Sequence, residues 1–324
     1  MRSIFHSQRG MLNPDLGGPL EPAIRMSGPD KGFVFRKWSP PAGLLLGATM
    51  MGRRLPGWAW MWVIALSLFF GAKWITVFAL MRSNSKVRPL RLAAYIFLWP
   101  GMDALKFCGS RSSFVPVTSE WIMPVAKTVF GAALVWLVAG SVVLVHPAFA
   151  GWVGMIGMVF VLHFGLFHLL SLVWRSVGIE AEPIMRSPTK ATSLARFWGE
   201  RWNTAFSNLM QRHIFVPLAR HIGPRKSLLG VFLISGLLHE LVISVPARGG
   251  YGLPTLYFVF QGFGLRFERS RVGKRLGLCS GWKGWAFVAL VAGLPALWLF
   301  HPPFIRNVIL PMLQAIGAVE RNYI

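Results

Sequence analysis

Long apolar runs constrain this chain more than any other feature. Several approach or exceed the roughly 20 residues that an α-helix needs to cross the hydrocarbon core of a bilayer. The clearest runs cover residues 58–81, 122–145, 152–174, 227–245 and 285–300. Shorter runs cover residues 92–107, 252–267 and 308–319, and the first of these is interrupted by Pro100, Gly101 and Asp103. We therefore predict an all-α, polytopic helical membrane protein with about six to nine membrane segments.

The composition supports an integral, multi-pass membrane protein. Of the 324 residues, 54% are hydrophobic and only 14% are charged, well below the roughly 25% of a soluble domain. The net charge of +23 indicates loops that set topology and contact anionic headgroups, or a surface that meets a phosphorylated substrate. We expect no nucleic-acid partner. Cys108 and Cys279 lie far apart, which predicts neither a metal site nor a disulfide framework.

The chain divides into a tail and one membrane-embedded domain. Residues 1–57 are basic and rich in glycine and proline, and their apolar patch "AGLLLGATMMG" is too short to span a bilayer. We predict a flexible N-terminal tail there, without a cleaved signal peptide, and a single domain over residues 58–324. Within that domain, residues 175–203 are polar. Residues 204–221 have an apolar and a basic side, which predicts an interfacial helix kinked near Pro217.

An ionisable residue stands inside the run at 227–245, in "SGLLHELVISVP". A histidine in a membrane span is costly unless it is paired or used, so His239 is a candidate general base. Ser235 lies one turn earlier and can fix the imidazole by a hydrogen bond, while Gly236 leaves room for a substrate chain. Glu240 needs a partner of its own. The alternative is a buried histidine that only holds helices together.

A second candidate functional segment is "RFWGERWN", residues 196–203. Tryptophans at the edge of an amphipathic helix are typical of an aromatic belt at the membrane interface. That interpretation accounts for Trp198 and Trp202 but less well for Asn203. A zinc site of the metalloprotease type is excluded at His239, because the residue four positions later is Ile243.

Three segments in this order, "FWGERWN", "IFVPLARH" and "SGLLHELVISVP", resemble the membrane-bound O-acyltransferase superfamily. Within it the chain is most similar to the wax synthase-like branch, which shares a W-x-x-R-W-N motif. Asn203 and His239 are 36 residues apart, as suits the two motifs of that superfamily. The resemblance covers about residues 173–267, and earlier spans match only in being hydrophobic.

The resemblance implies helices around an intramembrane chamber that receives acyl-CoA from the cytosolic side and an alcohol from the membrane or the far side. His239 and Asn203 correspond to the catalytic motif residues. Gln261 falls where lipid-acylating relatives carry a glutamine near the thioester. We expect Gln261, Ser235, Trp198, Trp202 and Arg201 to contribute to substrate binding. Acyl-CoA is the co-substrate, and no cofactor or metal is expected.

The chemistry of ester formation assigns the roles. A neutral imidazole takes the proton of the attacking hydroxyl, and donors such as Asn203 and Gln261 stabilise the oxyanion, unless Asn203 only shapes the chamber. Few polar groups surround His239, so we expect an apolar acceptor, with a long-chain alcohol and a wax ester favoured. Arg196, Arg201 and the basic interfacial helix can meet the CoA phosphates or lipid headgroups.

Other functions stay open. The acceptor can instead be a sterol, a diacylglycerol, a glycan or a small metabolite. A different class is a proton-coupled transporter, in which His239 and Glu240 form a relay with Lys73 and Asp103 as further intramembrane charges. Against it, the sequence has no paired halves with matching interrupted helices. A third possibility is a scaffold in which the motifs only pack.

Overall fold

The computed structural model describes residues 31–83, 87–109 and 115–320, and this part of the chain forms helices without a β-strand. Expectations for residues 1–30 lie outside it. The α-helices are α1 (Lys31–Met50), α2 (Gly57–Met81), α3 (Pro89–Leu98), α4 (Ala104–Gly109), α5 (Thr118–Ala133), α6 (Ala139–Val142), α7 (Pro147–Val159), α8 (Phe167–Ser176), α9 (Leu194–Arg196), α10 (Thr204–Met210), α11 (Val216–Ile222), α12 (Pro224–His239), α13 (Val245–Ala247), α14 (Leu253–Glu268), α15 (Arg271–Arg275), α16 (Gly281–Val288), α17 (Ala296–Leu299), α18 (Pro302–Phe304) and α19 (Leu310–Ala315).

Five helices of the described residues are long and apolar enough to cross a membrane. They are Gly57–Met81, Thr118–Val142, Pro147–Ser176, Pro224–Ala247 and Gly281–Leu299. These match the five clearest apolar runs of the sequence. The other predicted segments are shorter helices, namely α3, α14 and the group from α18 to α19. The expected number of six to nine segments is therefore reached only when these shorter helices are included.

Turns of the wider π type interrupt most of the long helices. They are η2 (Leu134–Val138), η3 (Phe160–Leu166), η5 (Phe197–Arg201), η6 (Gln211–Phe215), η7 (Glu240–Ser244), η8 (Ala289–Gly293) and η9 (Ile305–Ile309). Four of them, η6 to η9, end two residues before a proline: Pro217, Pro246, Pro295 and Pro311. Proline has no N–H and its ring clashes with the carbonyl four residues earlier, so the helix widens there. The predicted distortion near Pro217 takes this form.

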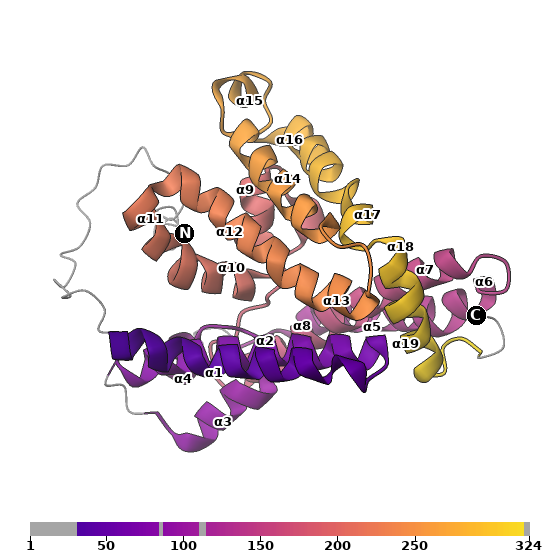
Figure 1. Ribbon diagram of the computed structural model, residues 1–324, viewed down its shortest axis with the longest axis horizontal. Coiled ribbons are helices and arrows are strands. Elements are labelled where there is room, and N and C mark those ends of the chain that lie inside the picture. The colour runs from indigo at the N-terminus through magenta and orange to yellow at the C-terminus, as the bar shows by residue number, and fades with distance from the viewer. Residues whose placement is uncertain (1–30, 84–86, 110–114, 321–324) are drawn as a thin grey trace.

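Residues 31–50 differ from the sequence interpretation of a flexible tail. They form α1, which lies along α2 (Figure 1). The indole Nε1 of Trp60 donates to the Ala48 carbonyl oxygen at 2.9 Å, and a Cβ on Gly71 would lie 3.0 Å from the Cβ of Pro41. Contacts with α2 thus order a segment whose glycines and prolines argue against a helix, because packing overrides local propensity.

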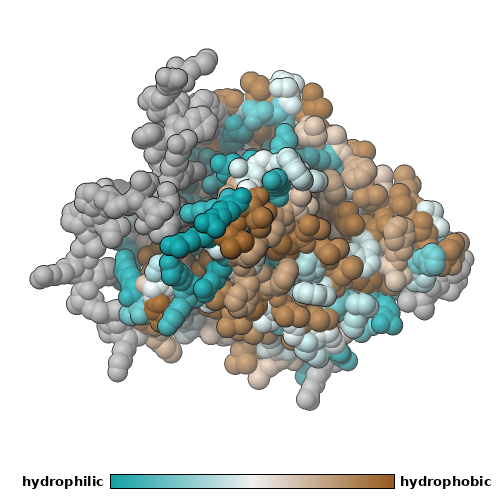
Figure 2. Space-filling view, turned by 90° about the horizontal axis from the view of Figure 1, so that it is seen from above, coloured by the Kyte–Doolittle hydropathy of each residue, from teal (hydrophilic) through white to brown (hydrophobic). Residues whose placement is uncertain are grey.

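The surface carries many apolar side chains. Figure 2 shows hydrophobic residues over much of one face, with hydrophilic residues gathered toward the left of the view. Large apolar side chains are exposed along the candidate spans, among them Met81, Leu137 and Leu290. A soluble monomer rarely exposes so much apolar area, whereas lipid solvates it. The chain is an integral, multi-pass membrane protein.

Candidate active site

His239 is the last residue of α12, inside the span Pro224–Ala247. Its Nδ1 lies 2.6 Å from the backbone carbonyl oxygen of Ser235. A carbonyl only accepts, so Nδ1 carries the proton and Nε2 keeps its lone pair. No hydrogen bond within the described residues engages Nε2. The half-buried imidazole packs on the Phe258 ring, with 4.3 Å between ring centroids.

Two expectations about the neighbours of His239 need correction. The Ser235 hydroxyl donates to the Val231 carbonyl oxygen at 2.9 Å, so the backbone of Ser235, not its side chain, orients the imidazole. A hydroxyl in a helix interior readily bonds to the carbonyl four residues earlier. Gly236 does not open a path for a substrate chain, because a Cβ there would lie 2.7 Å from the Cα of Thr255. The missing side chain instead lets α14 approach α12.

Glu240 finds its partner on α14. Its Oε1 accepts hydrogen bonds from the backbone N–H and the hydroxyl of Thr255, both at 3.0 Å. Its Oε2 is buried and has no hydrogen-bond partner among the described residues. One turn later, Ser244 lies 3.2 Å from Nε2 of the fully buried His301. Polar groups thus continue along this side of the span beyond His239.

Trp198 connects the segment "FWGERWN" with the His239 helix. Its indole Nε1 donates to Gln261 Oε1 at 3.3 Å. Its ring lies against Phe258 with 5.7 Å between centroids, and Phe258 in turn contacts His239. Residues 41 positions apart in the sequence, Trp198 and His239, are therefore joined through a single aromatic side chain of α14.

Gln261 is completely buried and both ends of its amide are engaged. While Oε1 accepts from Trp198, Nε2 donates to the Val291 carbonyl oxygen at 2.6 Å. Val291 lies four residues before Pro295, so its carbonyl lacks the usual helical N–H. Gln261 satisfies it, and thereby ties η5, α14 and η8 together.

The other predicted site residues bond to nearby segments. Trp202 stacks on Phe197, with 5.6 Å between centroids and 15° between planes. Arg201 Nη1 donates to the carbonyl oxygens of Arg186 and Ser187 at 3.0 and 3.1 Å, and its buried Nε has no partner among the described residues. Arg201 thus holds the polar segment before α9 in place.

Asn203 has a left-handed backbone, with φ of 41°. Its Oδ1 accepts from the backbone N–H of Phe206 at 3.2 Å and caps α10. Asparagine is favoured for both features, since it tolerates positive φ and caps helices well. No hydrogen bond in the described ranges joins Asn203 to His239.

Sequence reasoning gives no specific role to two residues that support the site. Phe258 is one of several apolar residues in the run after His239, and nothing in the sequence distinguishes it from the others. Glu268, at the end of α14, is buried, and its carboxylate accepts from the backbone N–H groups of Leu194 and Ala195. These donors begin α9, which leads into η5. Burial raises the pKa of the Glu268 carboxyl, while the two N–H donors act against that shift.

The intramembrane charges of the transporter hypothesis lie in other environments. Lys73 Nζ donates to the Gly101 carbonyl oxygen at 2.6 Å, and Asp103 pairs with Arg212 at 2.9 Å. Neither contacts His239 or Glu240 in the described structure. Among the described residues, no three or more histidine, cysteine, aspartate or glutamate side chains are grouped so that they could hold a metal ion.

Comparisons with known proteins agree on one family. Residues 181–260 match the model of the membrane bound O-acyl transferase family. A probable long-chain-alcohol O-fatty-acyltransferase 2 of Arabidopsis thaliana is 29% identical over 46% of this chain and 48% of its own length. The long-chain-alcohol O-fatty-acyltransferase of Simmondsia chinensis is 28% identical over 58% of this chain and 57% of its own.

An acyl-CoA–sterol O-acyltransferase 1 of Arabidopsis thaliana is 29% identical over 44% of this chain and 44% of its own length. The chain thus spans about half the length of the curated relatives it matches. The matched region 181–260 contains Trp198, Asn203 and His239. Over this region the chain is similar to the membrane bound O-acyl transferase family, and the relatives named long-chain-alcohol O-fatty-acyltransferase agree with the predicted likeness to its wax synthase-like branch.

Proposed function

We propose that this protein transfers an acyl group from acyl-CoA to the hydroxyl of an apolar alcohol, with a long-chain alcohol favoured, so that a wax ester forms. The observation that carries the proposal is the imidazole of His239. It stands in a membrane span, its Nδ1 is bound to the Ser235 carbonyl, and its Nε2 lone pair is unengaged within the described residues. The family match over residues 181–260 agrees with it.

In the proposed reaction, His239 Nε2 takes the hydroxyl proton while the alcohol oxygen attacks the thioester carbonyl. The tetrahedral intermediate then expels the CoA thiolate, which receives the proton from the imidazolium. The products are an ester and free CoA, and no covalent enzyme intermediate is needed. General base catalysis of this kind contributes typically 10²–10⁴-fold.

The oxyanion of the intermediate needs hydrogen-bond donors. Gln261 is a weaker candidate than Asn203, because one N–H of its Nε2 already donates to Val291 and its side chain is completely buried. In Asn203 only Oδ1 is engaged, as the cap of α10, so the N–H groups of its Nδ2 remain for a substrate. We therefore favour Asn203 as the donor.

The surroundings of His239 support an apolar acceptor. Phe258 covers the imidazole, and Thr255 is committed to Glu240. A glycan hydroxyl buried there without a partner would cost roughly 1–3 kcal/mol, whereas an alkyl chain has no such cost. Acylation of a sterol is the second candidate, supported by the similarity to the sterol O-acyltransferase of Arabidopsis thaliana.

The test is acyl transfer by purified protein in detergent. Palmitoyl-CoA is offered with hexadecanol, a sterol, a diacylglycerol or glucose in separate reactions, and the products are identified by mass spectrometry. We expect hexadecyl palmitate from the wild type and from His146→Ala, a control at an exposed turn, but not from His239→Ala. Sterol ester in preference to wax ester would overturn the favoured acceptor. Transfer to none of the four would overturn the enzymatic proposal.

A further inference from the structure

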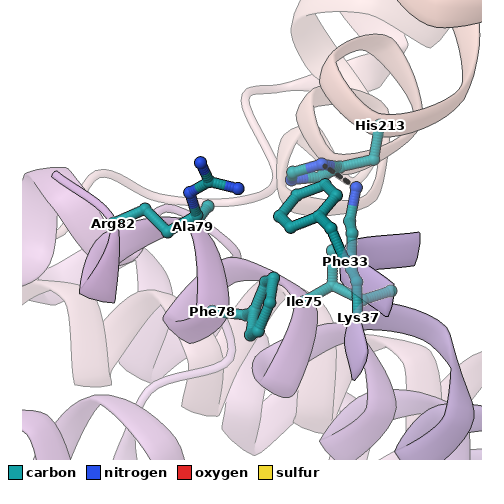
Figure 3. A pocket seen from close by; sticks show the side chains of 7 residues that line it. All are labelled: Phe33, Lys37, Ile75, Phe78, Ala79, Arg82 and His213. Atoms are coloured by element: carbon teal, nitrogen blue, oxygen red, sulfur yellow. Dashed lines mark hydrogen bonds between the residues drawn. The ribbon is translucent and has the colours of Figure 1, made fainter. Parts of the chain in front are cut away.

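A cleft of about 410 Å³ lies away from the His239 site, between α1, α2 and η6 (Figure 3). The consecutive helices α1 and α2 form two of its sides, and η6, which is distant in the sequence, contributes His213. Its lining residues are Phe33, Lys37, Ile75, Phe78, Ala79, Arg82 and His213. All the groups that can carry a charge are basic, and the other side chains are apolar.

Two cations in this cleft have no counter-ion among the described residues. Lys37 Nζ donates to His213 Nδ1 at 3.3 Å, and the Arg82 guanidinium lies 4.5 Å from the centroid of the Phe33 ring. Neither Lys37 nor Arg82 forms an ion pair with another described residue. The neighbouring Arg212, by contrast, is neutralised by Asp103 at 2.9 Å. Within the part of the chain that the structure describes, the positive charge of the cleft is therefore uncompensated.

The pKa of His213 is consistent with an excess of positive charge in the cleft. Burial, together with the charges of Lys37 and Arg212, lowers the pKa of His213 to about 4. The histidine is neutral at pH 7 and accepts from the ammonium of Lys37, which keeps two further N–H donors. Burial also lowers the pKa of Lys37. A bound anion would favour the charged form of both side chains and so oppose the lowering of their pKa values.

The place of the cleft in the fold indicates what kind of anion fits. Arg82 directly follows α2, which ends at Met81 and is one of the candidate membrane spans. The end of a span lies where lipid headgroups meet the hydrocarbon core. Phe33, Ile75 and Phe78 provide an apolar surface beside the two cations. A small soluble anion would leave that surface unused, whereas an anionic amphiphile would cover it.

We propose that this cleft binds the phosphate of an anionic amphiphile, with the phosphate held by Lys37 and Arg82 and the adjoining chain on Phe33, Ile75 and Phe78. Two sources share this chemistry: an anionic membrane phospholipid and an acyl-CoA. The inference does not rest on acyl transfer, since binding alone defines it.

The first experiment is native mass spectrometry of the full chain in a neutral detergent, titrated separately with phosphatidylglycerol and with phosphatidylcholine. A cation near a membrane surface contributes about 1 kcal/mol to anion binding, so two give a preference for phosphatidylglycerol on the order of tenfold or more. The double variant Lys37→Gln/Arg82→Gln should lose this preference. Arg275→Gln, which removes an exposed cation on α15, should keep it.

A second variant tests the space and leaves the charges in place. Ala79→Trp puts a large side chain on the lining of the cleft and should weaken phosphatidylglycerol binding while Lys37 and Arg82 remain. Equal binding of the two lipids by the wild type would overturn the proposal. So would an unchanged preference in the double variant.

Competition identifies the source. Palmitoyl-CoA is added to the phosphatidylglycerol complex of the wild type. Displacement of the lipid, with palmitoyl-CoA binding lost in the double variant, assigns the cleft to acyl-CoA. Simultaneous binding of both molecules assigns it to the phospholipid and places any acyl-CoA site elsewhere.

Discussion

Lys73 and His239 are both ionisable residues within membrane spans, and the protein treats them differently. Lys73 is 1% exposed; its Nζ donates to the Gly101 carbonyl oxygen and lies 3.6 Å from the centroid of the Tyr95 ring. His239 uses one nitrogen for the Ser235 carbonyl and keeps the other unengaged among the described residues. A fully engaged polar group stabilises one packing, whereas a half-engaged one is available for chemistry.

The environment of Lys73 explains an irregularity of the sequence. The apolar run at 92–107 is broken at Pro100 and Gly101, and in the structure α3 ends at Leu98. The chain between α3 and α4 is not helical, so the Gly101 carbonyl oxygen points to a side chain instead of a helical N–H. The break in this run thus supplies the acceptor that makes Lys73 tolerable inside α2.

The largest expected effect is on the half-engaged residue. His239→Ala removes the proposed base and should lower the rate of acyl transfer by about 10²–10⁴-fold. The apparent Tm in detergent should fall only modestly, because the half-buried imidazole contributes one hydrogen bond within its own helix and one ring contact with Phe258. Parallel measurement of transfer rate and thermal unfolding checks this. A folded variant that retains the wild-type rate would remove His239 from the mechanism and make it resemble Lys73.

Lys73→Met should show the opposite pattern. The substitution keeps the apolar length of the side chain but leaves the buried Gly101 carbonyl without its donor, which costs roughly 1–3 kcal/mol. We expect a lower apparent Tm and an unchanged transfer rate per folded molecule. A loss of rate at wild-type Tm would contradict the structural role and revive the hypothesis of an intramembrane relay.

Gln261 resembles Lys73 in being buried and in donating a hydrogen bond to a backbone carbonyl oxygen. Gln261→Leu should destabilise the protein by about 1–3 kcal/mol, since the Val291 carbonyl and the Trp198 indole both lose their partner. Gln314→Leu, a half-buried glutamine near the end of α19, is the control. The readouts are again apparent Tm and transfer rate. A fall in rate without a fall in Tm would instead place Gln261 at the oxyanion.

Substitutions of Asn203 should change stability least. They also distinguish most sharply between a role in shaping the backbone and a role as hydrogen-bond donor to the oxyanion. Asn203→Ala loses the cap of α10 and strains a backbone with φ of 41°, each at about 1 kcal/mol. Asn203→Gly removes the strain and most of the cap penalty. If Asn203 only shapes the backbone, the glycine variant should transfer acyl groups nearly as fast as the wild type. If its amide stabilises the oxyanion, both variants should be slow while the glycine variant stays stable.

The five spans were predictable because they depend on the length of apolar runs, which the sequence displays directly. The sequence indicated that "FWGERWN" and the His239 helix belong to one site only through the resemblance to a known superfamily. The physical basis of this link lies in Phe258 and Gln261, whose contacts depend on how α14 crosses α12. The acceptor of the Gln261 amide was hidden for another reason. It is a backbone carbonyl, made available by a proline four residues further along the chain.

The packing of α1 on α2 is a second contact between helices that the sequence did not predict. Residues 42–52 are too short an apolar patch to span a bilayer, and the local composition indicates a tail. The helix depends on α2 for its partners, such as Trp60 and Gly71. Local sequence carries no record of such a partner. For Ser235 the expected role of the hydroxyl was wrong, because the bond to His239 comes from the backbone carbonyl, which any residue at this position would supply.

The wide turn η7, directly after His239, has a consequence for insertions and deletions. A π turn holds one residue more than a regular turn, so a residue after η7 faces about 100° away from the direction that regular winding would give it. Regular winding through Glu240–Ser244 at the same chain length would therefore rotate the two halves of the span against each other. His239 would then keep its place against Phe258 only if Ser244 turned away from His301. Deleting one residue from the turn would remove the widening without this rotation, whereas inserting one would turn Ser244 by about 100° relative to His239.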